Sequence, residues 1–84
     1  MYEITLYGTL GCHLCDDALT VITSSLGAKA HVTYVDIADD PQLVVSMGMI
    51  IPVVQYKHTS LHWPFTTMDI RQLVGISPKR RYLI

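Results

Sequence analysis

The sequence predicts a small α/β domain whose strands and helices follow one another in the order β-α-β-α-β-β-α. Short β-branched and aromatic runs alternate with stretches of helical apolar spacing, and two neighbouring runs near the middle can form a hairpin. A strand-helix-strand unit implies a right-handed parallel crossover, and the hairpin adds antiparallel strands. We therefore expect one four-stranded mixed sheet, with helices covering it, in a single domain over residues 1–84.

The first half of the chain contains a strand, a helix and a second strand. Residues 2–7 are β-branched and aromatic, and this strand ends at Gly8. After a loop at residues 8–11, a helix begins near the first cysteine and ends at Gly27. Residues 32–37 form the second strand, apolar enough to be a buried parallel one. The apolar face of the helix consists of Leu14, Ala18, Val21, Ile22 and Leu26.

The second helix has start and stop signals but a short body. Asp39 or Asp40 can cap its N-terminus, Pro41 fits its first turn, and Gly48 lies near its end.

A hairpin and a third helix complete the predicted fold. The hairpin strands are expected at residues 52–57 and 61–63, joined around residues 58–60, although this turn contains no Gly or Asn. Residues 66–69 have the pattern of a capping box, which opens a last helix that runs to Gly75. The remaining residues form a tail.

Composition excludes several classes of function. The chain is 50% hydrophobic and 15% charged with a net charge of -1, which argues against disorder and against binding to nucleic acid. The basic run at 79–81 is too short to change that conclusion. The sequence opens on Tyr2 without a basic segment or a long apolar run, so we expect neither a secretory signal nor a membrane helix. A cytoplasmic location, where thiols are normally kept reduced, is expected.

The most informative feature is the pair Cys12 and Cys15, the only cysteines in the chain. They follow a strand and stand at the start of a helix, a context that favours redox chemistry. A single C-x-x-C with no second cysteine pair is a poor zinc site, so no metal is expected. As a structural crosslink the four-residue loop would contribute only about 2 kcal/mol. Thiol exchange instead needs one accessible thiolate and one nearby resolving thiol. We assign Cys12 as the nucleophile and Cys15 as the resolving thiol.

The pKa of Cys12 is expected to be moderately lowered from about 8.5. A helix dipole contributes about 0.3–1 kcal/mol, less than one pKa unit. Asp16 and Asp17 oppose the shift, since carboxylates disfavour a nearby thiolate. Backbone N–H groups at the helix start, or a charged His13, must therefore supply the rest of the expected lowering of the Cys12 pKa.

Two short signatures in the right order, Cys12-His13-Leu14-Cys15 after the first strand and Ile51-Pro52 before the third, resemble the thioredoxin fold in its small glutaredoxin-like form. The resemblance covers residues 2–75 and implies a three-layer α/β/α sandwich. It further implies that Pro52 is cis and packs beside the thiols, and that the backbone of Ile51 pairs with an extended substrate. The apolar residues before Pro52 would place a flat apolar surface near Cys12.

The chain departs from glutaredoxins at several positions that concern glutathione. His13 and Leu14 replace the usual Pro-Tyr between the cysteines, and residues 9–11 offer no lysine. Ile50 stands where the family has threonine, and residues 63–66 replace a Gly-Gly turn that helps to hold the glutathione carboxylate. The helix start at Thr66 still offers free N–H groups to an anion, although Thr66 is expected mainly to cap the helix.

These observations predict a monomeric glutaredoxin-like thiol-disulfide oxidoreductase. It needs no bound metal or organic cofactor, and its electron donor is either glutathione or a protein reductase. Its partners would be disulfide-containing proteins or glutathione mixed disulfides, without nucleic acid or membrane. Two alternatives remain open. One is a thioredoxin-fold adaptor that binds through the surface around Ile51, Pro52 and Trp63 without redox turnover. The other is a zinc or iron–sulfur site shared between two chains.

Overall fold

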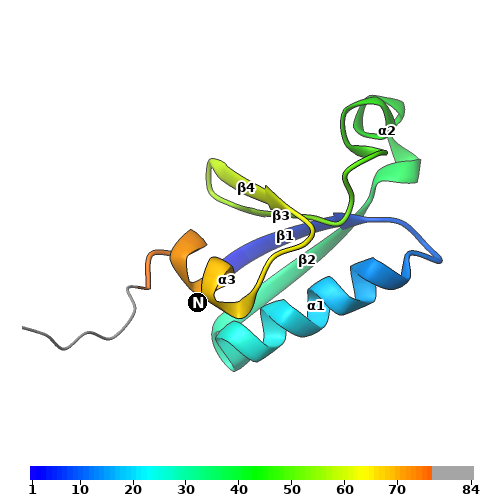
Figure 1. The fold of residues 1–84 in the computed structure, drawn as a ribbon. Coiled ribbons are helices and arrows are strands. Elements are labelled where there is room, and N and C mark those ends of the chain that lie inside the picture. The colour runs from blue at the N-terminus through cyan, green and yellow to red at the C-terminus, as the bar shows by residue number, and fades with distance from the viewer. Residues whose placement is uncertain (77–84) are drawn as a thin grey trace, which may run out of the picture.

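The structure, a computed structural model, describes residues 1–76, and the elements follow the predicted order (Figure 1). Residues 77–84, which include the basic run at 79–81, lie outside the described residues. The helices and strands are β1 (Tyr2–Gly8), α1 (His13–Leu26), β2 (Ala30–Asp36), α2 (Pro41–Met47), β3 (Val53–Tyr56), β4 (Thr59–His62) and α3 (Thr67–Leu73), with short 3-10 turns η1 (Gly27–Lys29) and η2 (Ile37–Asp39).

The strands described in residues 1–76 form one four-stranded mixed sheet, as predicted, and their order across the sheet is β2-β1-β3-β4. β1 runs parallel to β2 and antiparallel to β3, and β3 runs antiparallel to β4. Tyr7 of β1 pairs with Val53, and Val53 pairs with His62. The C-terminal end of β1, the start of β3 and the end of β4 therefore lie at the same end of the sheet, which we call the thiol end.

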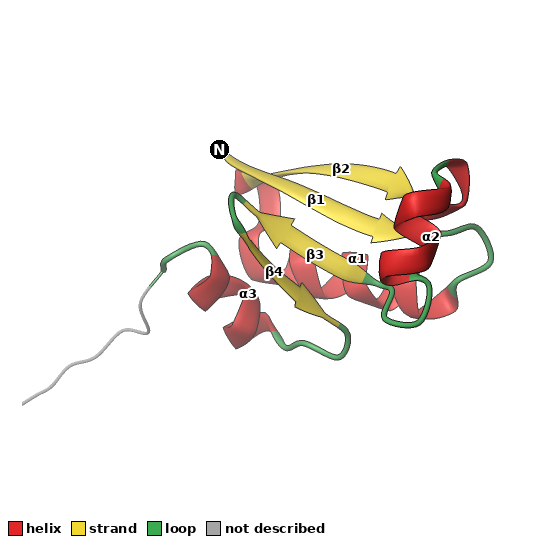
Figure 2. Cartoon of the chain, turned by 90° about the horizontal axis from the view of Figure 1, so that it is seen from above, coloured by secondary structure: helices red, strands yellow, loops and turns green. Residues whose placement is uncertain are grey.

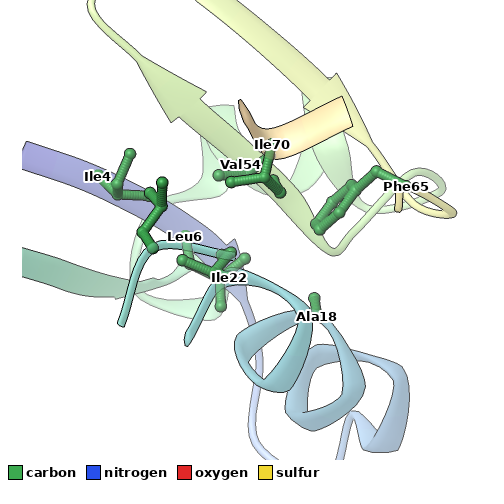
Figure 3. Packing of buried hydrophobic residues seen from close by; sticks show 8 residues of the cluster. Ile4, Leu6, Ala18, Ile22, Val54, Phe65 and Ile70 are labelled. Carbon is green, nitrogen blue, oxygen red and sulfur yellow. The ribbon is translucent and has the colours of Figure 1, made fainter. Parts of the chain in front are cut away.

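Helices lie on both faces of the sheet, which confirms the three-layer architecture. α1 and α3 cover one face and α2 covers the other (Figure 2). The core lies between the sheet and α1 with α3, where apolar side chains from the two central strands meet those of the helices (Figure 3). Its fully buried members are Ile4, Leu6, Ala18, Ile22, Leu26, Val54, Phe65 and Ile70.

β2 is parallel, as predicted, but it is not a buried strand. None of its residues from Ala30 to Asp36 is fully buried, because β2 lies at the edge of the sheet and pairs only with β1. The strand also begins two residues earlier than expected. The apolar composition of the predicted strand 32–37 correctly indicated a parallel strand. Composition alone did not distinguish an edge strand from a central one.

The hairpin forms, but its turn comes earlier in the chain than predicted. Its strands end at Tyr56 and begin again at Thr59, and these two residues pair directly. The turn therefore consists of Lys57 and His58 rather than residues 58–60. Lys57 adopts a left-handed conformation with φ 55, a role normally taken by Gly or Asn. The absence of those residue types is what made the turn hard to place.

The helix boundaries follow the capping signals in the sequence. Of the two candidate caps for α2, Asp40 accepts a hydrogen bond from the Gln42 N–H at 2.9 Å, and Pro41 occupies the first turn. α3 opens with the predicted capping box between Thr66 and Asp69. In the part of the chain that the structure describes, no helix combines the length and apolar character needed to span a bilayer.

Candidate functional site

Cys12 is the N-cap of α1, and Cys15 lies one turn further into the helix. The Cys12 Sγ accepts a hydrogen bond from the Cys15 N–H at 3.2 Å, so the sulfur takes the position that a serine or aspartate oxygen takes in most N-caps. The two Cα atoms are 5.2 Å apart and the sulfurs form a disulfide. The helix start thus brings the two sulfurs together and gives the leading one a hydrogen-bond donor that would favour its thiolate.

The two sulfur-bearing residues differ in their exposure. Cys15 is 1% exposed and lies among the buried residues, whereas Cys12 is partly exposed. Of the two residues, only Cys12 is therefore open to solvent. This asymmetry is the one that a nucleophilic and a resolving thiol require.

Gly8, the last residue of β1, lies directly against Cys15. A Cβ atom at this position would be 2.7 Å from the Cys15 Sγ and would also collide with the Tyr34 hydroxyl. Only glycine leaves room for the sulfur and the phenol at the end of the strand. In the sequence Gly8 is recognisable only as a strand terminus, because its contact with Cys15 depends on how α1 packs against β1.

Tyr34 of β2 is a further neighbour of the thiol pair that the sequence analysis missed. Its hydroxyl donates to the Thr9 carbonyl at 3.1 Å and lies beside Gly8 and Cys15. Partial burial raises the pKa of the Tyr34 hydroxyl, and the carboxylates of Asp36 and Asp16 raise it further. The phenol is therefore neutral at physiological pH. Its only sequence signal is its position near the end of a strand parallel to β1.

The Ile51–Pro52 peptide bond is cis, as the resemblance implied, and Pro52 is fully buried. Because Tyr7 pairs with Val53, Pro52 comes next to the end of β1, where Gly8 contacts Cys15. The Pro52 carbonyl accepts a hydrogen bond from the Trp63 N–H at 2.9 Å, which extends the pairing of β3 with β4 by one step. The proline therefore belongs to the same end of the sheet as the thiols.

The backbone of Ile51 is only partly available to a partner. Its N–H donates to the Met47 carbonyl at 3.0 Å and thereby connects the end of α2 to the start of β3. No residue in the described range 1–76 donates to the Ile51 carbonyl. The backbone pairing with substrate that the resemblance implied for Ile51 would therefore have to use the carbonyl, because the N–H is already bonded.

A second cis peptide bond, Trp63–Pro64, was not predicted. The indole of Trp63 packs edge-on against Phe65 with ring centroids 5.1 Å apart, and Phe65 belongs to the core. This segment leads the chain from β4 to α3 in place of the Gly-Gly turn of glutaredoxins. The only sequence signal was an X–Pro pair, and most X–Pro bonds are trans.

Thr66 caps α3 rather than standing free at the helix start. Its hydroxyl accepts from the Asp69 N–H at 3.2 Å, and its own N–H donates to the Asp69 carboxylate at 2.9 Å. The carboxylate already places negative charge at this helix start, which weakens its attraction for an external anion. An anion-binding role of Thr66 stays a prediction.

The surroundings of Cys12 are apolar and exposed. His13 and Leu14, which lie between the cysteines, are exposed, as are Leu10 in the preceding loop at 88% and Met49 before Pro52 at 97%. Ile50 is also exposed. Within residues 1–76 no three His, Cys, Asp or Glu side chains come together as a metal site would require. The thiol end therefore carries exposed apolar side chains as well as a partly exposed cysteine.

Comparisons with known proteins bear on the family and the fold of this chain. The profile of the glutaredoxin-like domain family (DUF836) matches residues 3–75. The crystal structure of target protein XcR50 from X. campestris is 32% identical, with a TM-score of 0.75, and the match covers 89% of this chain and 99% of that one. The solution structure of the same protein has a TM-score of 0.73 at 32% identity, over 95% and 100% of the two chains. A search of curated proteins gave no match.

Proposed function

Because this chain belongs to the glutaredoxin-like domain family, we propose that it is a thiol-disulfide oxidoreductase that acts through Cys12 and Cys15. The observation that carries the proposal is the disulfide at the start of α1, with Cys12 partly exposed and Cys15 buried. A helix N-cap favours the thiolate form of Cys12, and a fold of this class can hold a partner disulfide against it.

The proposed reaction has two exchange steps. The Cys12 thiolate attacks a partner disulfide, forms a mixed disulfide and releases the first partner thiolate. Cys15 then gives up its proton, attacks the Cys12 sulfur and releases the second partner thiolate. Two electrons have passed from the dithiol to the partner, and the Cys12–Cys15 disulfide has formed. Glutathione or a protein reductase then returns the dithiol, with no bound metal or organic cofactor.

Four further residues are proposed to serve these steps. The carbonyl of Ile51 and the buried ring of Pro52 would align an extended partner backbone beside the thiols. His13, exposed between the cysteines, would favour the Cys12 thiolate when it is protonated. Thr66 would contribute through the start of α3. The two electron donors, glutathione and a protein reductase, work in the cytoplasm, and we propose that the protein acts there. We further propose that it acts as a monomer.

The test is reduction of insulin, and of a glutathione mixed disulfide, with glutathione as donor and separately with thioredoxin reductase. We expect turnover with one donor, its loss in Cys12→Ser, and a trapped mixed disulfide on Cys12 in Cys15→Ser. The two variants are matched because each removes the same crosslink, about 2 kcal/mol for so short a loop, and each keeps one thiol. Equal behaviour of the two variants would contradict the assigned roles.

A binding module without redox turnover is the second candidate, favoured by the exposed apolar side chains of Leu10, Met49 and Ile50. It predicts that Cys12→Ser binds partners as wild type does and that the Cys12–Cys15 couple has no potential in the cellular range. No turnover with either donor, together with unchanged binding by Cys12→Ser, would favour this candidate over the enzyme.

A further inference from the structure

The charged residues are divided unequally between the two ends of the sheet. Residues 1–76 contain seven carboxylates and three Lys or Arg side chains. Lys29 precedes β2, and Lys57 lies in the turn between β3 and β4, so both belong to the end opposite the thiols. Arg71 is in the last turn of α3, away from the thiol end (Figure 1). Five carboxylates belong to the thiol end: Asp16, Asp17, Asp36, Asp39 and Asp40.

The topology explains why these five carboxylates gather there. Asp16 and Asp17 lie in the first turns of α1, directly after the cysteines, and both are exposed. Asp36 ends β2 and is the register partner of Gly8, which contacts Cys15. Asp39 and Asp40 follow in the connection to α2 and are exposed. The C-terminal ends of two parallel neighbouring strands lie at the same end of a sheet. The residues that follow β2 therefore lie near those that follow β1, which include the two cysteines.

A second observation links this charge to the sulfurs themselves. The Tyr34 hydroxyl lies against Gly8 beside the Cys15 sulfur. After burial, the carboxylates of Asp36 and Asp16 are the groups that raise the pKa of this hydroxyl. The negative potential of two different elements, β2 and α1, therefore extends to a group next to the disulfide.

The exposed apolar side chains at the thiol end would favour a partner that brings apolar groups of its own. Leu10 and Leu14 flank the cysteines in sequence, and Met49 and Ile50 precede Pro52. Within the described residues no Lys or Arg lies at the thiol end, so an anionic partner would find neither of these side chains to pair with there.

We propose that the Cys12–Cys15 pair exchanges preferentially with disulfides in basic, apolar peptide segments and discriminates against anionic disulfides such as glutathione disulfide. This inference rests on the proposed function and names its substrate class. The exchange is the two-step reaction given above: Cys12 attacks, one partner thiolate leaves, Cys15 resolves the mixed disulfide, and the second partner thiolate leaves. The carboxylates take no part in bond making. They raise the local concentration of cationic partners and lower that of anionic ones.

The size of the effect can be estimated from Coulomb's law. If an average separation on the order of 10 Å is taken for illustration, five unit charges in water give a rate ratio between singly charged cations and anions of about a hundredfold at 0.01 M salt. Screening reduces the ratio to about tenfold at 0.15 M. A strong dependence on salt is therefore part of the inference.

The experiment uses the full chain in its dithiol form and three small disulfides. Cystamine carries positive charge, dithiodiglycolate carries negative charge and hydroxyethyl disulfide is neutral. Oxidation of the protein is followed at pH 8. Each rate is divided by the rate of the same disulfide with dithiothreitol, which removes differences in intrinsic reactivity. We expect the order cationic, neutral, anionic, converging as salt is added.

A pair of variants tests where the potential comes from. Asp16→Asn together with Asp17→Asn should lower the cation-to-anion ratio about fivefold at low salt. A changed thiol pKa would alter all three rates alike and leave the ratio unaffected. Glu3→Gln is the matched control, because it removes a carboxylate at the opposite end, where Glu3 contacts His31 at 2.7 Å. It should leave the ratio unchanged.

The outcomes separate this inference from the function on which it rests. Normalised rates that are equal for the three disulfides, that favour the anionic one, or that do not depend on salt would overturn the charge selectivity and leave the exchange activity standing. A failure of all three disulfides to react would overturn the proposed function itself.

Discussion

The two faces of the sheet differ sharply in how they are covered. The face under α1 and α3 holds the contiguous core, in which Leu6, Ile22 and Ile70 are fully inaccessible to solvent. α2, on the other face, has no fully buried residue, and its Val45 is 88% exposed. Stability therefore resides on one face. The thiols stand at the start of α1, at the thiol end of the sheet, with Cys15 buried and Cys12 partly exposed.

This difference shows how a small domain can combine a rigid site with an accessible one. α1 is fixed by the core along its length, so its first turn holds Cys15 firmly behind Cys12. The connection from α2 to Pro52, by contrast, leaves Met49 and Ile50 exposed beside the thiol end. A partner can approach the loosely covered face without disturbing the core.

The largest expected contrast compares truncations on the two faces. Ile22→Ala leaves a cavity in the core and should lower the free energy of unfolding by about 2–5 kcal/mol. Val45→Ala removes an exposed side chain and should change it by less than about 0.5 kcal/mol. Urea unfolding of both variants measures the difference. Similar losses would show that the face under α2 is as tightly packed as the core.

The next effect concerns the contact of β1 with the thiols. Gly8→Ala forces a methyl group against the Cys15 sulfur and the Tyr34 hydroxyl, and should destabilise the protein by about 1–3 kcal/mol. Removing the hydroxyl in Gly8→Ala/Tyr34→Phe should recover part of this loss. A double-mutant cycle by denaturant unfolding measures the coupling. Strict additivity would mean that Gly8 and Tyr34 do not share the space that we describe.

A smaller contrast is expected between the two helix caps. Thr66→Ala removes the capping box of α3, which carries the buried Ile70, and should lower the free energy of unfolding by about 1 kcal/mol. Asp40→Ala removes the cap of α2 and should affect global stability less, because α2 can open locally. Hydrogen exchange should then show faster exchange of α2 amides alone. Equal global losses would contradict the division between the faces.

The smallest effect is a pH dependence of stability at the thiol end. The pKa of Tyr34 is raised in the folded state by burial, then by Asp36 and Asp16. The folded state thus favours the protonated phenol, and this stabilisation is present below the unfolded pKa of about 10 and lost as pH rises through the folded pKa.

Unfolding measurements between pH 9 and 11 test this sign. Wild type should lose slightly more stability over the interval than Tyr34→Phe, the effect being small because Tyr34 is 44% exposed. Tyr7→Phe, which removes another hydroxyl with a 3.1 Å hydrogen bond, is the matched control variant for the loss of a hydroxyl. A Tyr34→Phe slope as steep as wild type would show that the phenol carries no such linkage.

Sequence patterns predicted the fold well because local and global signals agree in this chain. Apolar spacing, the cap at Thr66 and the glycine at position 27 each mark an element that the structure contains. Two predictions were wrong, the position of the hairpin turn and the burial of β2. Lys57 takes a left-handed turn position, and β2 is an edge strand despite its apolar composition. Neither fact is encoded in spacing alone.

The site was predictable only in its local part. Cys12 and Cys15 are three residues apart at the start of one helix. The cis geometry of the Ile51–Pro52 bond was predicted from the resemblance to the thioredoxin fold. Gly8, Tyr34 and the gathered carboxylates come from different strands and helices, so their proximity depends on strand register. Pairing of the N–H of Ile51 within the chain likewise follows from how α2 ends, which sequence reasoning placed only near Gly48.

The unequal accessibility of the two sulfurs is tested most directly by brief alkylation of the reduced protein with iodoacetamide, followed by peptide mass analysis. Cys12 should be modified first, at a rate at least about tenfold above that of Cys15, because thiolate character and exposure both favour it. Modification of Cys15 first, or at an equal rate, would contradict the account.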